Sequence, residues 1–165
     1  MSVDSNTYRR LIDIGLALSA EKHIDSLLER LLREAKSMAN ADAGTLYLKT
    51  EHDTLAFAIL LNDSLGINQG GESGDPVSLP DVPLTAPDGS GNVMNIASRA
   101  AITGETVNIA DVYNTEGIDA AGTKRFDELT GYRSRSFLTV PMKNYADETI
   151  GVLQLLNAKD ESGQV

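Results

Sequence analysis

The chain has 165 residues, of which 41% are hydrophobic and 23% charged, a composition typical of one soluble globular domain. Its formal net charge of -10 disfavours a phosphate-backbone partner and an anionic membrane surface, so we expect neither nucleic-acid binding nor membrane insertion. The sequence contains no cysteine, which excludes disulfides, thiolate nucleophiles and cysteine-bound metals, and it has no long apolar run; both features fit a cytoplasmic location.

Two helices are expected at the N-terminus. A weak helical pattern covers residues 8–17, and a continuous apolar stripe over residues 24–38, with spacings of three and four, predicts a stronger amphipathic helix. The chain is therefore divided into an N-terminal helical segment, residues 1–23, and a domain of residues 24–165. Because the apolar helical surface exceeds what one sheet face needs, we expect a homodimer that uses residues 8–38.

The rest of the chain predicts an α+β fold around an antiparallel sheet of about six strands. Residues 93–101 form a predicted helix capped by Asn92, and residues 123–129 form another; a glycine ends each of them. Residues 62–92 and 111–122 are rich in turn-forming types and are expected to be loops. The expected strands, which are rich in β-branched and apolar residues, are 45–49, 54–61, 106–109, 136–142 and 150–157.

The sequence offers little support for catalysis. The only histidines, His23 and His52, lie at the start of a helix and in a hairpin turn, and neither has a partner at metal-ligand spacing. Asp127 and Glu128 are adjacent on a helix, so they face different directions and do not form an acid–base pair. We expect no catalytic residue, no metal site, no required cofactor and no enzyme activity in this chain.

Several segments together resemble the GAF domain family, whose members are small-molecule-sensing and dimerisation modules of signalling proteins. These segments are LLER at 27–30, ADAGTLYL at 41–48, TGYRSRSFLTVPM at 130–142 and GVLQLLN at 151–157. The resemblance implies a central antiparallel sheet of about six strands, with helices on one face and ligand-covering loops on the other.

A narrower resemblance is to GAF domains upstream of nucleotide cyclases and of HD-GYP phosphohydrolases, the bacterial cyclic di-GMP phosphodiesterases. It rests on NDSLGI at 62–67, LPDVPL at 79–84 and GTKRFDE at 122–128. It implies a regulatory domain that controls an output domain, such as a metal-dependent phosphohydrolase, in a longer parent protein. The closing C-terminal helix of the family is not recognised after Asn157, and Ala158 stands where the family has a lysine, so we expect this chain to be part of that parent.

The resemblance also implies a ligand site. The family's cyclic-nucleotide binders hold the phosphate at the start of the helix that precedes a Thr-Gly pair, which corresponds here to the helix that ends at Gly104. They contact the base from the next short helix and the strand after it. The primary expectation is a small-molecule ligand of unspecified chemistry; a cyclic nucleotide, or no ligand and a purely dimerising role, remain alternatives. Phe126 has core packing as its own alternative. The ligand-binding residues implied are Ile96, Ala97, Thr123, Phe126, Asp127, Thr130 and Ser134.

Overall fold

The computed structural model describes residues 5–20, 23–72 and 74–165. Residues 1–4 and 21–22 of the expected N-terminal segment 1–23 lie outside the described residues. No helix in the described ranges is long and apolar enough to cross a membrane. The elements are α1 (Ser5–Ala20), α2 (Ile24–Met38), β1 (Ala41–Lys49), β2 (Thr54–Asn62), β3 (Ile67–Gly70), β4 (Val82–Pro83), α3 (Ile96–Thr103), β5 (Val107–Ile109), η1 (Val112–Asn114), α4 (Ala121–Thr130), β6 (Phe137–Lys143) and β7 (Thr149–Ala158).

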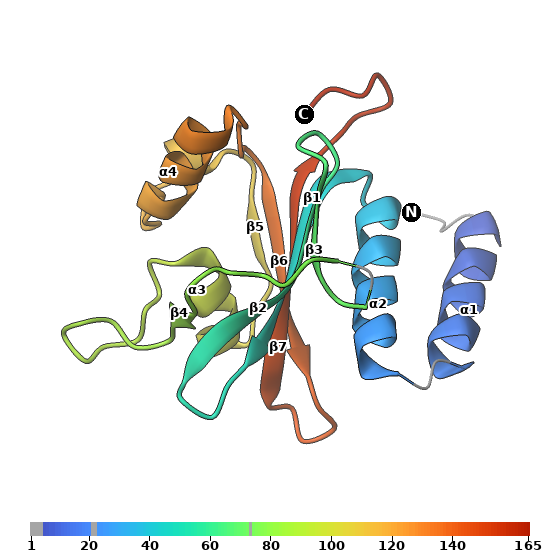
Figure 1. The fold of residues 1–165 in the computed structure, drawn as a ribbon, viewed down its shortest axis with the longest axis horizontal. Coiled ribbons are helices and arrows are strands. Elements are labelled where there is room, and N and C mark those ends of the chain that lie inside the picture. The colour runs from blue at the N-terminus through green and yellow to red at the C-terminus, as the bar shows by residue number, and fades with distance from the viewer. Residues whose placement is uncertain (1–4, 21–22, 73) are drawn as a thin grey trace.

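The strands form one antiparallel sheet in the order β3-β2-β1-β7-β6-β5, with β4 pairing beside β2 (Figure 1). The long strands β1 and β7 lie at its centre and pair from Ala41 opposite Ala158 to Leu48 opposite Gly151. The expected antiparallel α+β architecture is thereby confirmed. The central pair joins segments more than a hundred residues apart, so the first and last strands of the domain hold each other in place.

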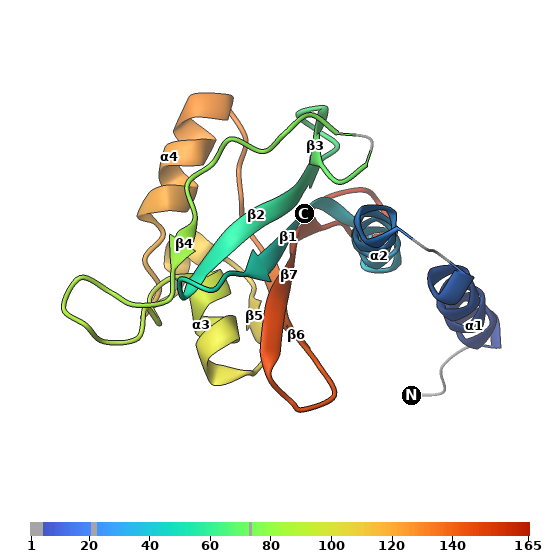
Figure 2. The same cartoon turned by 60° about the horizontal axis from the view of Figure 1, so that its bottom comes forward.

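Helices and irregular segments cover the two faces of the sheet differently. In both views α2 lies on one face with α1 outside it, whereas α3, α4 and the connection from β4 to α3 lie on the other (Figures 1 and 2). The connection from β3 to β4 begins beside α2, where the Glu72 amide donates to the Glu29 carboxylate at 3.1 Å. The α2 face is sealed by Leu32, which packs with Leu46 and Leu153 in an apolar cluster. A Cβ on Gly44 would approach the Leu32 side chain to 2.9 Å, so glycine lets α2 lie close to β1.

The segment expected as one loop over residues 62–92 contains two short strands. β3 and β4 both pair with β2 through the backbone, so their pairing depends little on side-chain type. β3 ends at Gly70, where φ is +75° and a Cβ would lie 1.9 Å from the Ala58 carbonyl oxygen, so only glycine fits. The other strands agree with expectation within one residue at most ends; β1 begins four residues early, at Ala41.

The two short helices begin at other residues than the sequence predicts. Asn95, rather than Asn92, caps α3 by accepting a 3.0 Å hydrogen bond from the Ser98 amide. The Asn92 side chain instead donates to the Pro83 carbonyl at 2.8 Å, which ties the chain before α3 to β4. α4 begins at Ala121, and its first amide donates to Asp119 at 2.9 Å.

Candidate ligand-binding site

The sheet face beneath α3 carries a chain of buried polar side chains. The Tyr47 hydroxyl on β1 donates to the Gln154 side-chain oxygen on β7 at 3.3 Å, and the Gln154 amide donates to the Thr139 hydroxyl on β6 at 3.1 Å. Tyr47 also packs against Phe57, with ring centroids 4.7 Å apart, and its burial raises the pKa of its hydroxyl. Polar groups inside a domain cost free energy unless they are paired, and these three side chains satisfy one another.

The N-terminal turn of α3 lies against this face. Ala97 packs in one apolar cluster with Tyr47 and Val152, and Ile96 packs in a second with Val112 and Phe137. Both side chains are therefore core, and what they can offer a ligand is their backbone amides. The amides of the first helical turn have no partner within the helix and are suited to an anion.

Ser98, in that same turn, holds the buried hydroxyl that stands out on this face. The residue is 0% exposed, and its Oγ has no hydrogen-bond partner among the residues that the structure describes. Its backbone amide is already used by the Asn95 cap. A buried hydroxyl without a partner costs roughly 1–3 kcal/mol. A ligand atom that accepted a hydrogen bond from this hydroxyl would recover that free energy.

On α4, Asp127 is the organising residue. Its carboxylate accepts hydrogen bonds from the Ser134 amide at 2.8 Å, the Ser134 hydroxyl at 2.7 Å and the Tyr113 hydroxyl at 2.8 Å. The bond to Asp127 is the main cause of a raised pKa for Tyr113. The Tyr113 ring also lies under two cations, with the Arg133 guanidinium carbon 3.4 Å and the Lys124 ammonium 5.3 Å from its centroid.

The remaining expected residues have local roles on α4. The exposed Thr130 donates to the Phe126 carbonyl at 2.8 Å, within the helix. Phe126 is half-buried and packs edge-on against Tyr132, with centroids 6.5 Å apart. Thr123 is half-buried in the first turn. The structure thus brings Asp127 and Ser134 into direct contact and places Ile96 and Ala97 on a separate helix of the same sheet face (Figure 1).

Polar contacts join α3 and the residues just before it to the loop before α4. Arg99 donates through Nε to the Val93 carbonyl at 2.6 Å and through its terminal nitrogen to the Gly117 carbonyl. The Asp119 amide donates to the Met94 carbonyl at 2.8 Å. These contacts tie residues 93–99 to residues 117–119, so α3 and the loop that leads into α4 are held together.

Sequence reasoning missed Tyr47, Ser98, Tyr113, Thr139 and Gln154. A signal existed for two of them, because Thr139 and Gln154 interrupt otherwise apolar strands at positions that face inward. A polar residue at an inward strand position is buried, and a buried polar residue must find a partner. No local pattern singles out Ser98, because its burial depends on where α3 packs.

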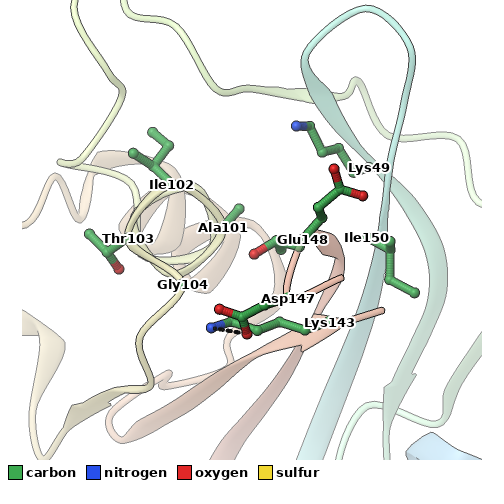
Figure 3. A pocket seen from close by; sticks show the side chains of 10 residues that line it. Lys49, Ala101, Ile102, Thr103, Gly104, Lys143, Asp147, Glu148 and Ile150 are labelled. Carbon is green, nitrogen blue, oxygen red and sulfur yellow. Dashed lines mark ion pairs between the residues drawn. The ribbon is translucent and has the colours of Figure 1, made fainter. Parts of the chain in front are cut away.

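A cleft of about 540 Å³ lies elsewhere, between the C-terminal end of α3 and the β6–β7 hairpin, and none of the expected residues lines it (Figure 3). Lys143 there pairs with Asp147 at 3.1 Å. Its ammonium would lie 3.3 Å from a Cβ on Gly104, beside the end of α3. A cation at a helix C-terminus stabilises the helix dipole, so this lysine has a structural role and the cleft carries mixed charge.

A central antiparallel sheet, with buried polar side chains beneath helix ends and long connections, defines a small α+β domain. The chain belongs to the GAF domain family, which matches residues 23–164. α1 precedes the matched region.

A curated relative is the dual 3',5'-cyclic-AMP and -GMP phosphodiesterase 11 of Drosophila melanogaster, 40% identical over 62 residues. The match covers 38% of this chain and 4% of the phosphodiesterase. The chain is thus related to the GAF regions of cyclic-nucleotide phosphodiesterases and spans a small part of their length.

Solved structures share the fold. The GAF domain of a phosphoenolpyruvate-protein phosphotransferase from Coxiella burnetii has a TM-score of 0.67 at 15% identity, over 92% of this chain and 77% of that one. A free methionine-R-sulfoxide reductase from Neisseria meningitidis, in complex with its substrate, has a TM-score of 0.61 at 20% identity, over 99% and 83%. Likeness at this level of identity concerns the fold alone.

Proposed function

We propose that this chain is a regulatory domain that senses a small molecule, held on the sheet face between α3 and α4. The observation that carries the proposal is the buried, unpartnered hydroxyl of Ser98 in the first turn of α3, among the residues that the structure describes. It lies in the same turn as the amides of Ile96 and Ala97, which suit an anion. The polar floor formed by Tyr47, Gln154 and Thr139 supplies further donors and acceptors.

A cyclic nucleotide is the ligand class that we favour. The relation to cyclic-nucleotide phosphodiesterases supports it, and so does the pairing of an anion-suited helix end with a face of hydroxyl and amide groups. Asp127 already accepts three hydrogen bonds. A carboxylate has about four acceptor positions, so Asp127 keeps one for a base amino group. A different small molecule and a ligand-free dimerisation module are the alternatives.

Ser98→Ala separates a binding role from a folding role. We expect the free variant to be as stable as the wild type or more stable, because an unpaired buried hydroxyl is removed. We expect its affinity for the bound nucleotide to fall about 5- to 10-fold, since one hydrogen bond of roughly 1 kcal/mol is lost. Thermal unfolding and isothermal titration with cyclic AMP, cyclic GMP and cyclic di-GMP measure both quantities.

Ser37→Ala is the matched control, because Ser37 is exposed on α2, on the other face of the sheet. Ser37 accepts a hydrogen bond from Arg10 of α1, so this control concerns the affinity alone, which it should leave unchanged. In the same titrations we expect Asp127→Ala to cost about 1–3 kcal/mol of affinity and Thr130→Val to cost less. Unchanged affinity in Ser98→Ala would place the ligand elsewhere, and no binding of any nucleotide by the wild type would favour another ligand or the ligand-free alternative.

We further propose that the domain controls an output domain of a longer protein and does not itself catalyse a reaction. The phosphodiesterase relative supports a phosphodiesterase output, and an HD-GYP phosphohydrolase is the form that the sequence resemblance favours. The likeness to a sulfoxide reductase, at 20% identity, concerns the fold and does not support a shared chemistry. The isolated chain is expected to leave cyclic nucleotides unhydrolysed.

A homodimer through α1 and α2 is the assembly that we propose. α1 lies outside α2 and exposes Leu11, Ile12 and Leu16, the last two by 62% and 67% (Figure 2). A hydrogen bond from Arg10 to Ser37, at 2.7 Å, joins the two helices. An apolar helical face of this kind on a soluble domain is a typical interface.

Leu16→Glu should therefore weaken self-association at least about tenfold, because burying a charge in an apolar interface without a partner is costly. Sedimentation equilibrium over a range of concentrations measures the effect. Leu129→Glu serves as the control, since Leu129 is 78% exposed on α4, across the sheet from α1. A wild-type chain that stays monomeric at high micromolar concentration would contradict the proposal.

A further inference from the structure

Asp42, in β1, is a buried carboxylate that takes no part in the candidate site. It is 2% exposed. Its side chain accepts hydrogen bonds from the Ser64 hydroxyl at 2.9 Å, from the Tyr132 hydroxyl at 2.8 Å and from the Lys159 ammonium. One carboxylate thus connects three segments that are distant in the sequence: the turn after β2, the residue that follows α4 and its glycine cap, and the first residue after β7.

Tyr132 is coupled to α4. It follows Gly131, whose left-handed backbone with φ of 71° ends the helix, and its ring packs edge-on against Phe126 on α4. Its amide also donates to the Thr130 hydroxyl at 3.3 Å. A movement of α4 must therefore move the hydroxyl that Asp42 binds.

Lys159 lies where the chain leaves the sheet. Its amide donates to the Asn40 carbonyl at 2.9 Å, and the Asn40 side chain donates back to the Lys159 carbonyl at 2.8 Å. The Lys159–Asp42 ion pair adds a side-chain bond to this backbone clasp. The segment that follows β7 is thus fixed to the start of β1, beside the C-terminal end of α2.

The charges support a lasting link. Burial alone raises the pKa of Asp42, but the hydrogen bonds from Lys159, Ser64 and Tyr132 and the charge of Lys159 together hold the pKa below its ordinary value. Burial, followed by the bond to Asp42, raises the pKa of Tyr132, so the tyrosine stays a neutral donor. An ionised acceptor with one cation and two hydroxyl donors is a compensated cluster, and losing one partner disturbs the others.

We propose that Asp42 couples α4 to the segment that follows β7, so that a displacement of α4 changes how firmly Lys159 is held. A ligand between α3 and α4 would in this way alter the route by which the chain leaves the domain. The ligand part of this inference rests on the proposed function, whereas the link from Tyr132 through Asp42 to Lys159 does not.

The absence of cysteine makes a site-specific probe possible. Glu161→Cys, at an exposed position two residues beyond Lys159, carries a nitroxide label whose mobility is read by electron paramagnetic resonance. We expect Tyr132→Phe, which removes one hydroxyl, to shift the spectrum toward the mobile component in the ligand-free protein, and Asp42→Asn to shift it further. Tyr145→Phe, the same exchange at a fully exposed hairpin position, is the matched control and should cause no shift.

A spectrum that is the same for Tyr132→Phe and the wild type would overturn the coupling, even if Asp42→Asn loosens the label, because Asp42 would then only anchor Lys159. Tyr132→Phe decides the question alone if Asp42→Asn does not fold. Where a nucleotide binds, saturation should shift the label in the wild type and not in Tyr132→Phe. Absence of nucleotide binding would count against the proposed function and leave the result for the ligand-free protein decisive for the coupling.

Discussion

Asp127→Ala is expected to lower the free energy of unfolding by about 2–4 kcal/mol. The substitution removes the acceptor for the Ser134 amide, the Ser134 hydroxyl and the Tyr113 hydroxyl. Ser134 is buried, with 1% exposure, so its two donors would lose their partner without gaining water. Urea denaturation followed by circular dichroism measures the change in stability.

Glu128→Ala is the control for that measurement, because Glu128 is the exposed neighbour of Asp127 on the same helix. Its effect should stay within about 0.5 kcal/mol. Asp127→Asn, which keeps the shape and one acceptor oxygen, should fall between the two. If Asp127→Ala were as stable as wild type, the three hydrogen bonds would not hold α4 to the strand that follows it. Affinities of the variant must be measured below its unfolding transition, since loss of fold would otherwise pass for loss of binding.

Leu46→Ala should lower the free energy of unfolding by about 2–5 kcal/mol, because it leaves a cavity at the centre of the α2 face. Leu46 is fully buried on β1 and packs with Leu32, Ile59 and Leu153. β1 is a central strand with neighbours on both sides, so it cannot move to fill the space without breaking its pairing. The midpoint of urea denaturation should fall while the slope stays constant.

Leu129→Ala, the same exchange at an exposed position on α4, tests whether the loss is one of packing. It should change stability by no more than about 0.5 kcal/mol. Equal losses for Leu46→Ala and Leu129→Ala would show that the cluster of Leu32, Leu46 and Leu153 is not the main core of the α2 face.

The sequence alone determined the elements whose signal is local. The apolar stripe of α2 has the period of a helix, and its observed bounds, Ile24–Met38, are the ones that the stripe predicts. Gly104 and Gly131 end α3 and α4 in left-handed conformations that glycine adopts without strain. The strands β2, β6 and β7 carry β-branched and apolar runs, so the antiparallel sheet could be predicted. Each of these features depends on residues that are neighbours in the chain.

Only the tertiary structure decided the partners of the polar groups and of the backbone. β3 and β4 exist because β2 offers them unpaired backbone groups, and their own sequences carry little strand signal. The sequence predicted Asp127 as a ligand-binding residue, but it did not indicate that Ser134 and Tyr113 donate hydrogen bonds to the Asp127 carboxylate. The link through Asp42 joins residues up to 117 positions apart. Periodicity records which face of an element is apolar, whereas hydrogen bonds and ion pairs depend on which distant segments the fold brings within about 3 Å.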